Sequence, residues 1–91
     1  MEIFYWQDYQ GREMDFVIRQ KRKIVSLIQV TLAYGRDDVT SRETNALIKG
    51  ADIFGCKDLK IITWDYEATE EIKGRKIDFI PLWKWLYFRN V

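Results

Sequence analysis

The sequence predicts an α/β fold, a single domain of residues 1–91 built around one mixed sheet. Two neighbouring segments alternate apolar and polar residues across a short basic loop, a capped helical segment follows them, and a nearly continuous apolar run comes after that helix. Apolar residues make up 47% of the chain, which suits one folded core at this length. We therefore expect antiparallel strands first and a parallel strand later.

Three β-prone segments, residues 3–6, 13–19 and 24–32, come first in the chain. The first precedes a polar stretch that contains a glycine. The other two alternate on either side of basic residues, which is typical of an antiparallel hairpin. Together the three segments predict a β-meander with the first segment at its edge.

The register of this hairpin gathers polar side chains on one face. A three-residue loop, Lys21–Lys23, pairs Gln20 with Ile24, and directly opposed residues point to the same side of a sheet. A loop one residue longer or shorter would break this alignment. One face then carries a polar set with apolar residues beyond it: Glu13, Asp15, Gln29 and Thr31, then Val17, Val25 and Leu27. The other face is expected to be a core: Met14, Phe16, Ile18, Ile28 and Val30.

A helix and a buried strand follow. Thr40 and Glu43 match a capping box that begins the helix, and Gly55 suits the left-handed residue that ends it. Residues 58–64 are a nearly continuous apolar run, which is typical of a strand covered on both faces beside a parallel neighbour. Strand, helix and strand therefore predict a βαβ unit.

The last third of the chain predicts one more strand and a second helix. Residues 65–74 read as acidic and turn-like, and residues 76–80 alternate as a fifth strand. Pro81 suits the first position of a helix. The tryptophans of that helix are either a stacking platform for bases or, as we favour, part of the core. One helical stripe would contain Leu82, Trp85, Leu86 and Arg89.

Composition excludes several classes of function. Fifteen basic and fourteen acidic residues nearly cancel, so no global basic field favours nonspecific nucleic-acid binding. The absence of histidine excludes histidine-ligated zinc and serine triads. The single cysteine, Cys56, excludes an internal disulfide and fits a reducing cytosol. No apolar run reaches the length of a membrane span, so we expect a cytoplasmic protein without a membrane partner.

The densest basic cluster lies at the predicted hairpin and contains Arg19, Lys21, Arg22 and Lys23. It is either a solvated hairpin tip or a local contact for nucleic acid.

The order of elements resembles the core of the PD-(D/E)xK nuclease superfamily, with Asp15 on the second strand and Gln29-Val30-Thr31 on the third. Residues 11–18, Gly-Arg-Glu-Met-Asp-Phe-Val-Ile, are similar to a motif of an uncharacterised nuclease-like domain family. That domain ends many archaeal and other prokaryotic AAA-type ATPases. Residues 27–31, 62–65 and 80–86 resemble its later blocks, so the resemblance covers almost the whole chain.

The resemblance implies a restriction-endonuclease-like mixed sheet in the order three strands, helix, two strands, helix. The helix that usually precedes the first strand is lacking, and so are the P-loop and Walker lysine of the ATPase module. We therefore expect a free-standing or truncated copy of the terminal domain. Dimerisation or a partner chain would cover the apolar surface that the missing helix leaves.

The resemblance also implies a degenerate active site. In active members the aspartate and a carboxylate of the third strand hold Mg²⁺, and a lysine two residues later neutralises charge on the phosphate. Gln29 and Thr31 occupy these last two positions, so only Asp15 is retained. Lys49 is the candidate replacement for the lysine, and Glu13 the candidate extra metal ligand.

We expect, therefore, a non-catalytic module that contacts nucleic acid or a partner ATPase. Two alternatives stay open. One is a Mg²⁺-dependent DNA endonuclease that works with Asp15, Gln29 and a substitute for the missing lysine. The other is a structural unit that forms a homodimer through its tryptophan-rich C-terminus.

Overall fold

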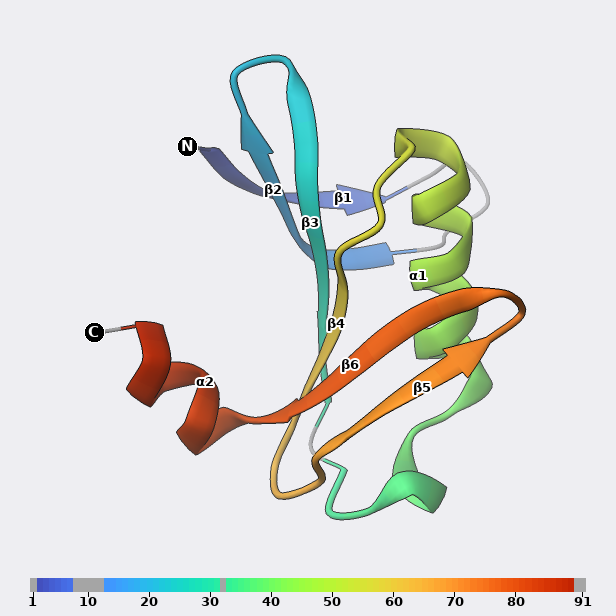
Figure 1. Ribbon diagram of the computed structural model, residues 1–91, viewed down its shortest axis with the longest axis vertical. Coiled ribbons are helices and arrows are strands. Elements are labelled where there is room, and N and C mark those ends of the chain that lie inside the picture. Colours follow the sequence, from blue (N-terminus) through green and yellow to red (C-terminus); the bar gives the residue numbers. More distant parts are fainter. Residues whose placement is uncertain (1, 8–12, 32, 90–91) are drawn as a thin grey trace.

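The computed structural model describes residues 2–7, 13–31 and 33–89, with the backbone alone at positions 4, 6, 7, 13–15, 88 and 89. The described residues form one sheet of six strands, two α-helices and a short 3-10 turn (Figure 1). In chain order the elements are β1 (Glu2–Gln7), β2 (Glu13–Gln20), β3 (Lys23–Val30), η1 (Arg36–Asp38), α1 (Ser41–Phe54), β4 (Leu59–Thr63), β5 (Ala68–Ile72), β6 (Arg75–Pro81) and α2 (Leu82–Arg89).

The strands lie in the order β1-β2-β3-β4-β6-β5. Strands β1, β2 and β3 form an antiparallel meander, and β5 pairs antiparallel with β6. The central pairs, β3 with β4 and β4 with β6, are parallel. The mixed α/β sheet is therefore confirmed, and so is the strand-helix-strand unit in which α1 connects two parallel neighbours.

Strand β5 is the element that sequence reasoning missed, because residues 65–74 were expected to be acidic and turn-like. It pairs with β6 across the two-residue turn Lys73–Gly74, where φ is 51° and 78°. Its apolar residues are confined to its two ends because it lies at the edge of the sheet. The observed order is three strands, helix, three strands, helix, so the expected order with two strands after the first helix is wrong.

Helix α1 has both of the ends that the sequence predicts. The backbone N–H of Thr40 donates to Oε2 of Glu43 at 2.9 Å, which completes the capping box. The helix ends at Gly55, which adopts the left-handed conformation with a φ of 65°. Its buried residues repeat at helical spacing and face the sheet: Thr44, Ala46, Leu47, Gly50 and Ala51.

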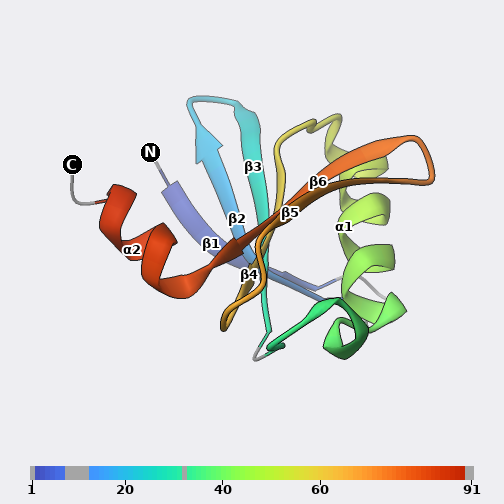
Figure 2. The same ribbon diagram turned by 60° about the horizontal axis from the view of Figure 1, so that its bottom comes forward.

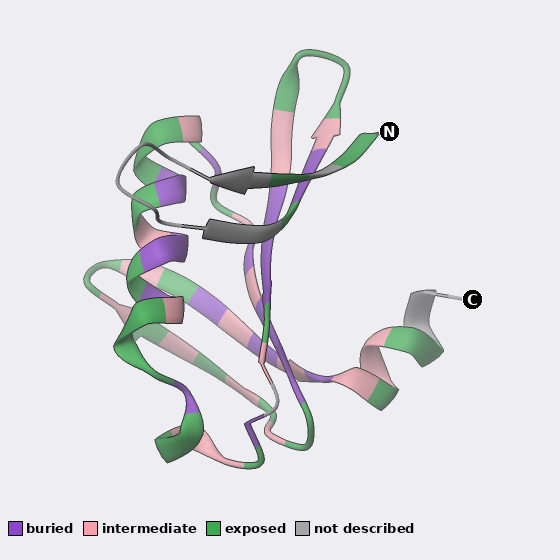
Figure 3. Ribbon diagram, turned by 180° about the vertical axis from the view of Figure 1, so that it is seen from behind, coloured by how far each residue is buried: buried purple, intermediate pink, exposed green. Residues whose placement is uncertain are grey.

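The main core lies between α1 and one face of the sheet, where Figure 3 shows the buried residues of the helix. Leu47 and Ala51 of α1 are fully buried against side chains from five strands or their ends. Fully burying one such aliphatic side chain stabilises a fold by roughly 1.5–3 kcal/mol, so this layer supplies most of the hydrophobic stabilisation. The least exposed strand residues are Val17, Leu27, Leu59, Ile61, Ile77 and Phe79.

The opposite face carries a smaller cluster beside α2, and Figure 2 shows the two helices on opposite sides of the sheet. Ile18, Ile28 and Ile62 are buried there, and Leu82 and Trp85 of α2 pack against them. Helix α2 is eight residues long, so it covers only part of this face.

The expectation that the Phe16 face forms the core is therefore wrong in part. Phe16 is 44% exposed and Val30 is 42% exposed, whereas Val17 and Leu27 of the other face are fully buried. The reason is that α1 crosses over the Val17 side, and both faces of the hairpin are apolar enough to accept it. Met14 was also assigned to that core, and its side chain lies outside the described part of the structure.

Two further observations complete the fold. Pro81 is the last residue of β6, and α2 begins one residue later, at Leu82.

Neither described helix has the length and apolar character needed to cross a membrane.

Candidate functional site

The β2–β3 hairpin has the register that the sequence predicts, although its turn is different. The pairs Phe16–Ile28, Val17–Leu27 and Ile18–Ser26 all agree with the predicted alignment. The expected three-residue loop is wrong, because Gln20 pairs with Lys23 and leaves a two-residue turn. The extra residue is Val25 of β3. It forms a bulge opposite the step from Ile18 to Arg19 of β2, where the register shifts, and it has no partner in β2.

This bulge moves Val25 to the other side of the sheet. Val25 was expected beside Leu27, but it packs against the cluster of Ile18 and Ile28. Ile24 takes the place that alternation gave to Val25 and packs against the main core.

The predicted carboxylate positions lie where β2 separates from β3. The last β2–β3 pair is Phe16–Ile28, one residue before the predicted pair of Asp15 with Gln29. The pair of Glu13 with Thr31 is likewise absent from the described β2–β3 ladder, and Glu13 pairs with Gln7 on the other side of β2. The side chains of Glu13 and Asp15 lie outside the described part of the structure.

Gln29 and Thr31 lie at the end of β3 on the α1 side of the sheet. Gln29 is 6% exposed and pairs with fully buried Ile61 of β4. Thr31 is half-buried, and its backbone N–H donates to the carbonyl of Ile62 at 2.8 Å, which continues the parallel ladder. Gln29 is therefore part of the buried layer on the α1 side of the sheet.

The described side chains do not fit a cation at this position. Gln29 and Thr31 offer an uncharged amide and hydroxyl, whereas Mg²⁺ prefers carboxylates and water. Lys49, the candidate replacement lysine, is exposed on α1. In the described part of the chain, no group of three or more Asp, Glu, Cys or His side chains could hold a metal ion.

The hairpin tip is a separate basic feature that projects past the rest of the sheet (Figure 1). Lys21, Arg22 and Lys23 are exposed, and no ion pair holds them among the described residues. Arg19 differs from them, because its guanidinium donates to Glu2 of β1 at 2.6 Å. The predicted basic cluster thus consists of one paired cation, Arg19, and three exposed cations at the hairpin tip, Lys21–Lys23.

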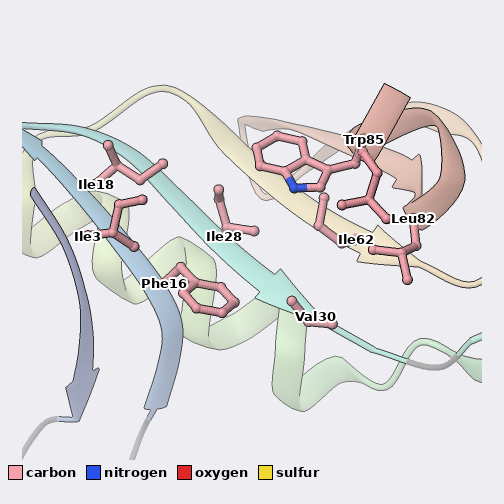
Figure 4. Close-up of a pocket in the computed structure, with 9 residues that line it drawn as sticks. Ile3, Phe16, Ile18, Ile28, Val30, Ile62, Leu82 and Trp85 are labelled. Atoms are coloured by element: carbon pink, nitrogen blue, oxygen red, sulfur yellow. The ribbon is translucent and has the colours of Figure 1, made fainter. Parts of the chain in front are cut away.

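An apolar groove of about 360 Å³ lies on the face opposite α1 (Figure 4). We call it the sheet groove; its floor comes from β1 to β4 and its wall from α2. The described residues that line it are all apolar: Ile3, Phe16, Ile18, Ile28, Val30, Ile62, Leu82, Trp85 and Leu86. The sequence predicted that Leu82, Trp85 and Leu86 share one side of α2, which forms this wall. It did not indicate that the strand residues of the floor would remain exposed.

A charged hollow lies on the other side of Trp85, over β4, β6 and β5. Two of its charges form ion pairs within the chain: Lys60 pairs with Asp58 at 2.5 Å, and Lys84 pairs with Glu67. Thr69 donates to Asp78 at 2.9 Å. Sequence reasoning did not single out these residues, because they are spread over four segments.

Two groups on the α1 side have shifted pKa values. Burial raises the pKa of the Cys56 thiol, which is 3% exposed. The hydroxyl of Tyr66 donates to Oε2 of Glu70 at 2.9 Å, and this hydrogen bond to a carboxylate raises the pKa of Tyr66. Neither group lines the sheet groove, so neither is a candidate acid or base there.

No family model matches this chain, and comparison with curated proteins and with solved structures found no similar one. The described surface has three candidate features: an uncharged position at the end of β3, a basic hairpin tip and the sheet groove.

Proposed function

We propose that this chain is a non-catalytic, PD-(D/E)xK nuclease-like domain that contacts the phosphate backbone of nucleic acid with its β2–β3 hairpin tip. The observation that carries the proposal is the run of three exposed cations, Lys21–Lys23, which no acidic side chain of the described residues neutralises. Such a module would couple an AAA-type ATPase to nucleic acid.

The sheet supports the restriction-endonuclease-like part of the proposal. Strands β2 and β3 form an antiparallel hairpin, and α1 leads from β3 to the parallel strand β4. The resemblance places Asp15 on the second strand and Gln29 on the third, and both positions fall on the expected strands.

The end of β3 supports the absence of catalysis. Gln29 carries no charge and lies 6% exposed beneath α1, and Thr31 cannot neutralise a phosphate. Removing one preorganised stabilising group typically costs about 10² to 10³ in rate, and two such groups are replaced here.

The expected binding is local and weak. The chain has a net charge of +1, so attraction comes from the tip and not from the whole molecule. Three phosphate contacts predict a slope of log K against log salt of about −2.7, which is roughly a 40-fold loss of affinity between about 50 and 200 mM salt.

Fluorescence anisotropy with labelled duplex and single-stranded DNA across a salt series tests the proposal. The triple variant Lys21→Gln, Arg22→Gln, Lys23→Gln should lose most of the binding and nearly all of the salt dependence. The matched control is Arg42→Gln, Lys73→Gln, Lys76→Gln, which removes the same charge elsewhere and should keep the wild-type slope. Equal binding by the two variants, or a wild type that DNA does not retain at low salt, would overturn the proposal.

The same protein, incubated with supercoiled DNA and Mg²⁺ or Mn²⁺, tests the absence of catalysis. We expect no nicking above the background of an Asp15→Ala variant. Nicking that Asp15→Ala abolishes would make the endonuclease alternative correct.

A further inference from the structure

The sheet face opposite α1 is only partly covered. Helix α2 packs on Ile62 and its neighbours, whereas no described helix or loop covers the floor over β1, β2 and β3 (Figure 2). Ile3, Phe16 and Val30 of this floor are 49%, 44% and 42% exposed. Sheets with central parallel pairs normally bury both faces, whereas the described residues cover the second face of this sheet only in part.

Helix α2 also has an apolar outer side. Trp83 is 61% exposed, Leu86 is 52% exposed and Tyr87 is 66% exposed. A second hollow lies between Trp64 and this helix, and Leu86 lines both hollows. The helix is therefore a ridge between two hollows: the sheet groove, and a second hollow that is apolar except for Asp65.

Ridge and hollows together expose enough apolar surface for a stable interface. Seven half-exposed apolar side chains lie on or beside α2. If each has a total surface of about 200 Å², together they expose on the order of 700 Å². A standard protein interface buries about 800 Å² on each partner. The seven are Ile3, Phe16, Val30, Trp64, Trp83, Leu86 and Tyr87.

We infer that this surface is the interface of a homodimer, in which α2 of each copy lies in the sheet groove of the other. A two-fold interface requires one patch that is complementary to itself, and here a ridge and a groove adjoin on one surface. Lys84, the charged residue whose side chain is described on α2, pairs with Glu67 of its own chain. The other described charge is Asp65, which is exposed in the lining of the second hollow, so the described patch is apolar apart from this carboxylate.

This inference does not depend on the proposed nucleic-acid contact, and it adds a consequence to it. The hairpin tip residues Lys21–Lys23 are not part of the groove lining, so a dimer would present two basic tips. Two linked weak contacts bind a long duplex more tightly than one.

Sedimentation equilibrium of the whole chain, without nucleic acid, tests the homodimer. We expect twice the monomer mass at micromolar concentration. Phe16→Arg on the groove floor and Leu86→Arg on the ridge each place a charge at a half-exposed position, so the fold should persist while the dimer dissociation constant rises at least 100-fold. Ile53→Arg is the matched control, because Ile53 is 48% exposed on the far side of the molecule, on α1.

Far-UV circular dichroism and thermal unfolding check that each variant is folded. A wild-type chain that stays monomeric up to about 1 mM, the weak end of specific association, overturns the inference. A dimer that tolerates both groove variants, or one that Ile53→Arg disrupts equally, overturns it as well.

Discussion

Gln29→Glu introduces a carboxylate at the position that the proposed nuclease resemblance assigns to a metal ligand, and the structure predicts that this substitution destabilises the fold. Glutamine and glutamate have nearly the same shape, so the substitution changes the charge and leaves the packing in place. The side chain is 6% exposed, on the same side of β3 as Leu27, and its strand partner Ile61 is fully buried. A carboxylate there would lose most of its hydration.

The size of the effect follows from the pKa of the introduced carboxyl group. Burial of this degree raises a glutamate pKa by up to about 3–5 units from its ordinary value of about 4.3. A buried carboxyl group whose pKa lies above 7 stays protonated, so at pH 7 the loss of stability is at most the cost of protonating it. That cost is about 3.7 kcal/mol, from about 1.36 kcal/mol for each pH unit between about 4.3 and 7. Because the folded-state pKa is raised, the loss is absent below the unfolded-state value and grows as the pH rises above it. A domain of this size is stable by about 5–14 kcal/mol, so the variant should still fold.

Urea unfolding followed by tryptophan fluorescence measures this loss at neutral pH and near pH 4. Gln29→Met is the control, because it removes the side-chain amide without adding charge. The difference in stability between this variant and the wild type should not grow with pH as it does for Gln29→Glu. We expect about 10 mM Mg²⁺ to stabilise Gln29→Glu no more than the wild type, whereas a site with a dissociation constant of about 1 mM would add roughly 1.4 kcal/mol. A variant as stable as the wild type at neutral pH, or one rescued by Mg²⁺, would refute the reasoning.

Three other predictions concern stability and reactivity. Phe79→Leu should cost about 1–3 kcal/mol, and a double-mutant cycle with Tyr66→Leu should give about 0.5–1.5 kcal/mol of coupling, because the two rings meet edge-on with centroids 5.4 Å apart. Losses of unfolding free energy that simply add in the double variant, measured by urea unfolding, would contradict this. The thiol of Cys56 should react slowly with Ellman's reagent in the folded chain and rapidly in urea, because burial raises its pKa and excludes the reagent; equal rates would show that Cys56 is accessible. Lys73→Asn should raise the thermal midpoint by a few degrees, equivalent to about 0.5–1 kcal/mol, because asparagine accepts the positive φ of the Lys73–Gly74 turn; a lower midpoint would contradict the turn geometry.

Local signals in the sequence predicted the parts of the fold that depend on neighbouring residues. Thr40 and Glu43 marked the start of α1, and Gly55 marked its end, because capping is decided within one turn of chain. The apolar run of residues 58–64 predicted a buried strand with a parallel neighbour, and β4 is the most completely buried strand.

The choice of the covered face was not predictable from the same signals. Both sides of the hairpin are apolar near its centre, and the side that α1 covers depends on the path of the crossover and not on any one residue. Strand β5 was hidden for a related reason. Its glutamates, Glu70 and Glu71, are compatible with an edge strand because one side of the strand has no neighbour, but they read as a loop.

The hairpin explains why its register was predictable while the candidate site was not. Buried residues must alternate to one face, so the pairing of Val17 with Leu27 is set by the core, and the turn only has to accommodate the residue left over. Whether that residue lies in the loop or in a bulge at Val25 makes no difference to the body of the hairpin. Asp15 lies beyond the last β2–β3 pair, where β2 keeps only β1 as a neighbour. The alternation of side chains along β3 therefore does not determine the position of Asp15, and a motif divided between two adjacent strands does not by itself ensure that its side chains meet.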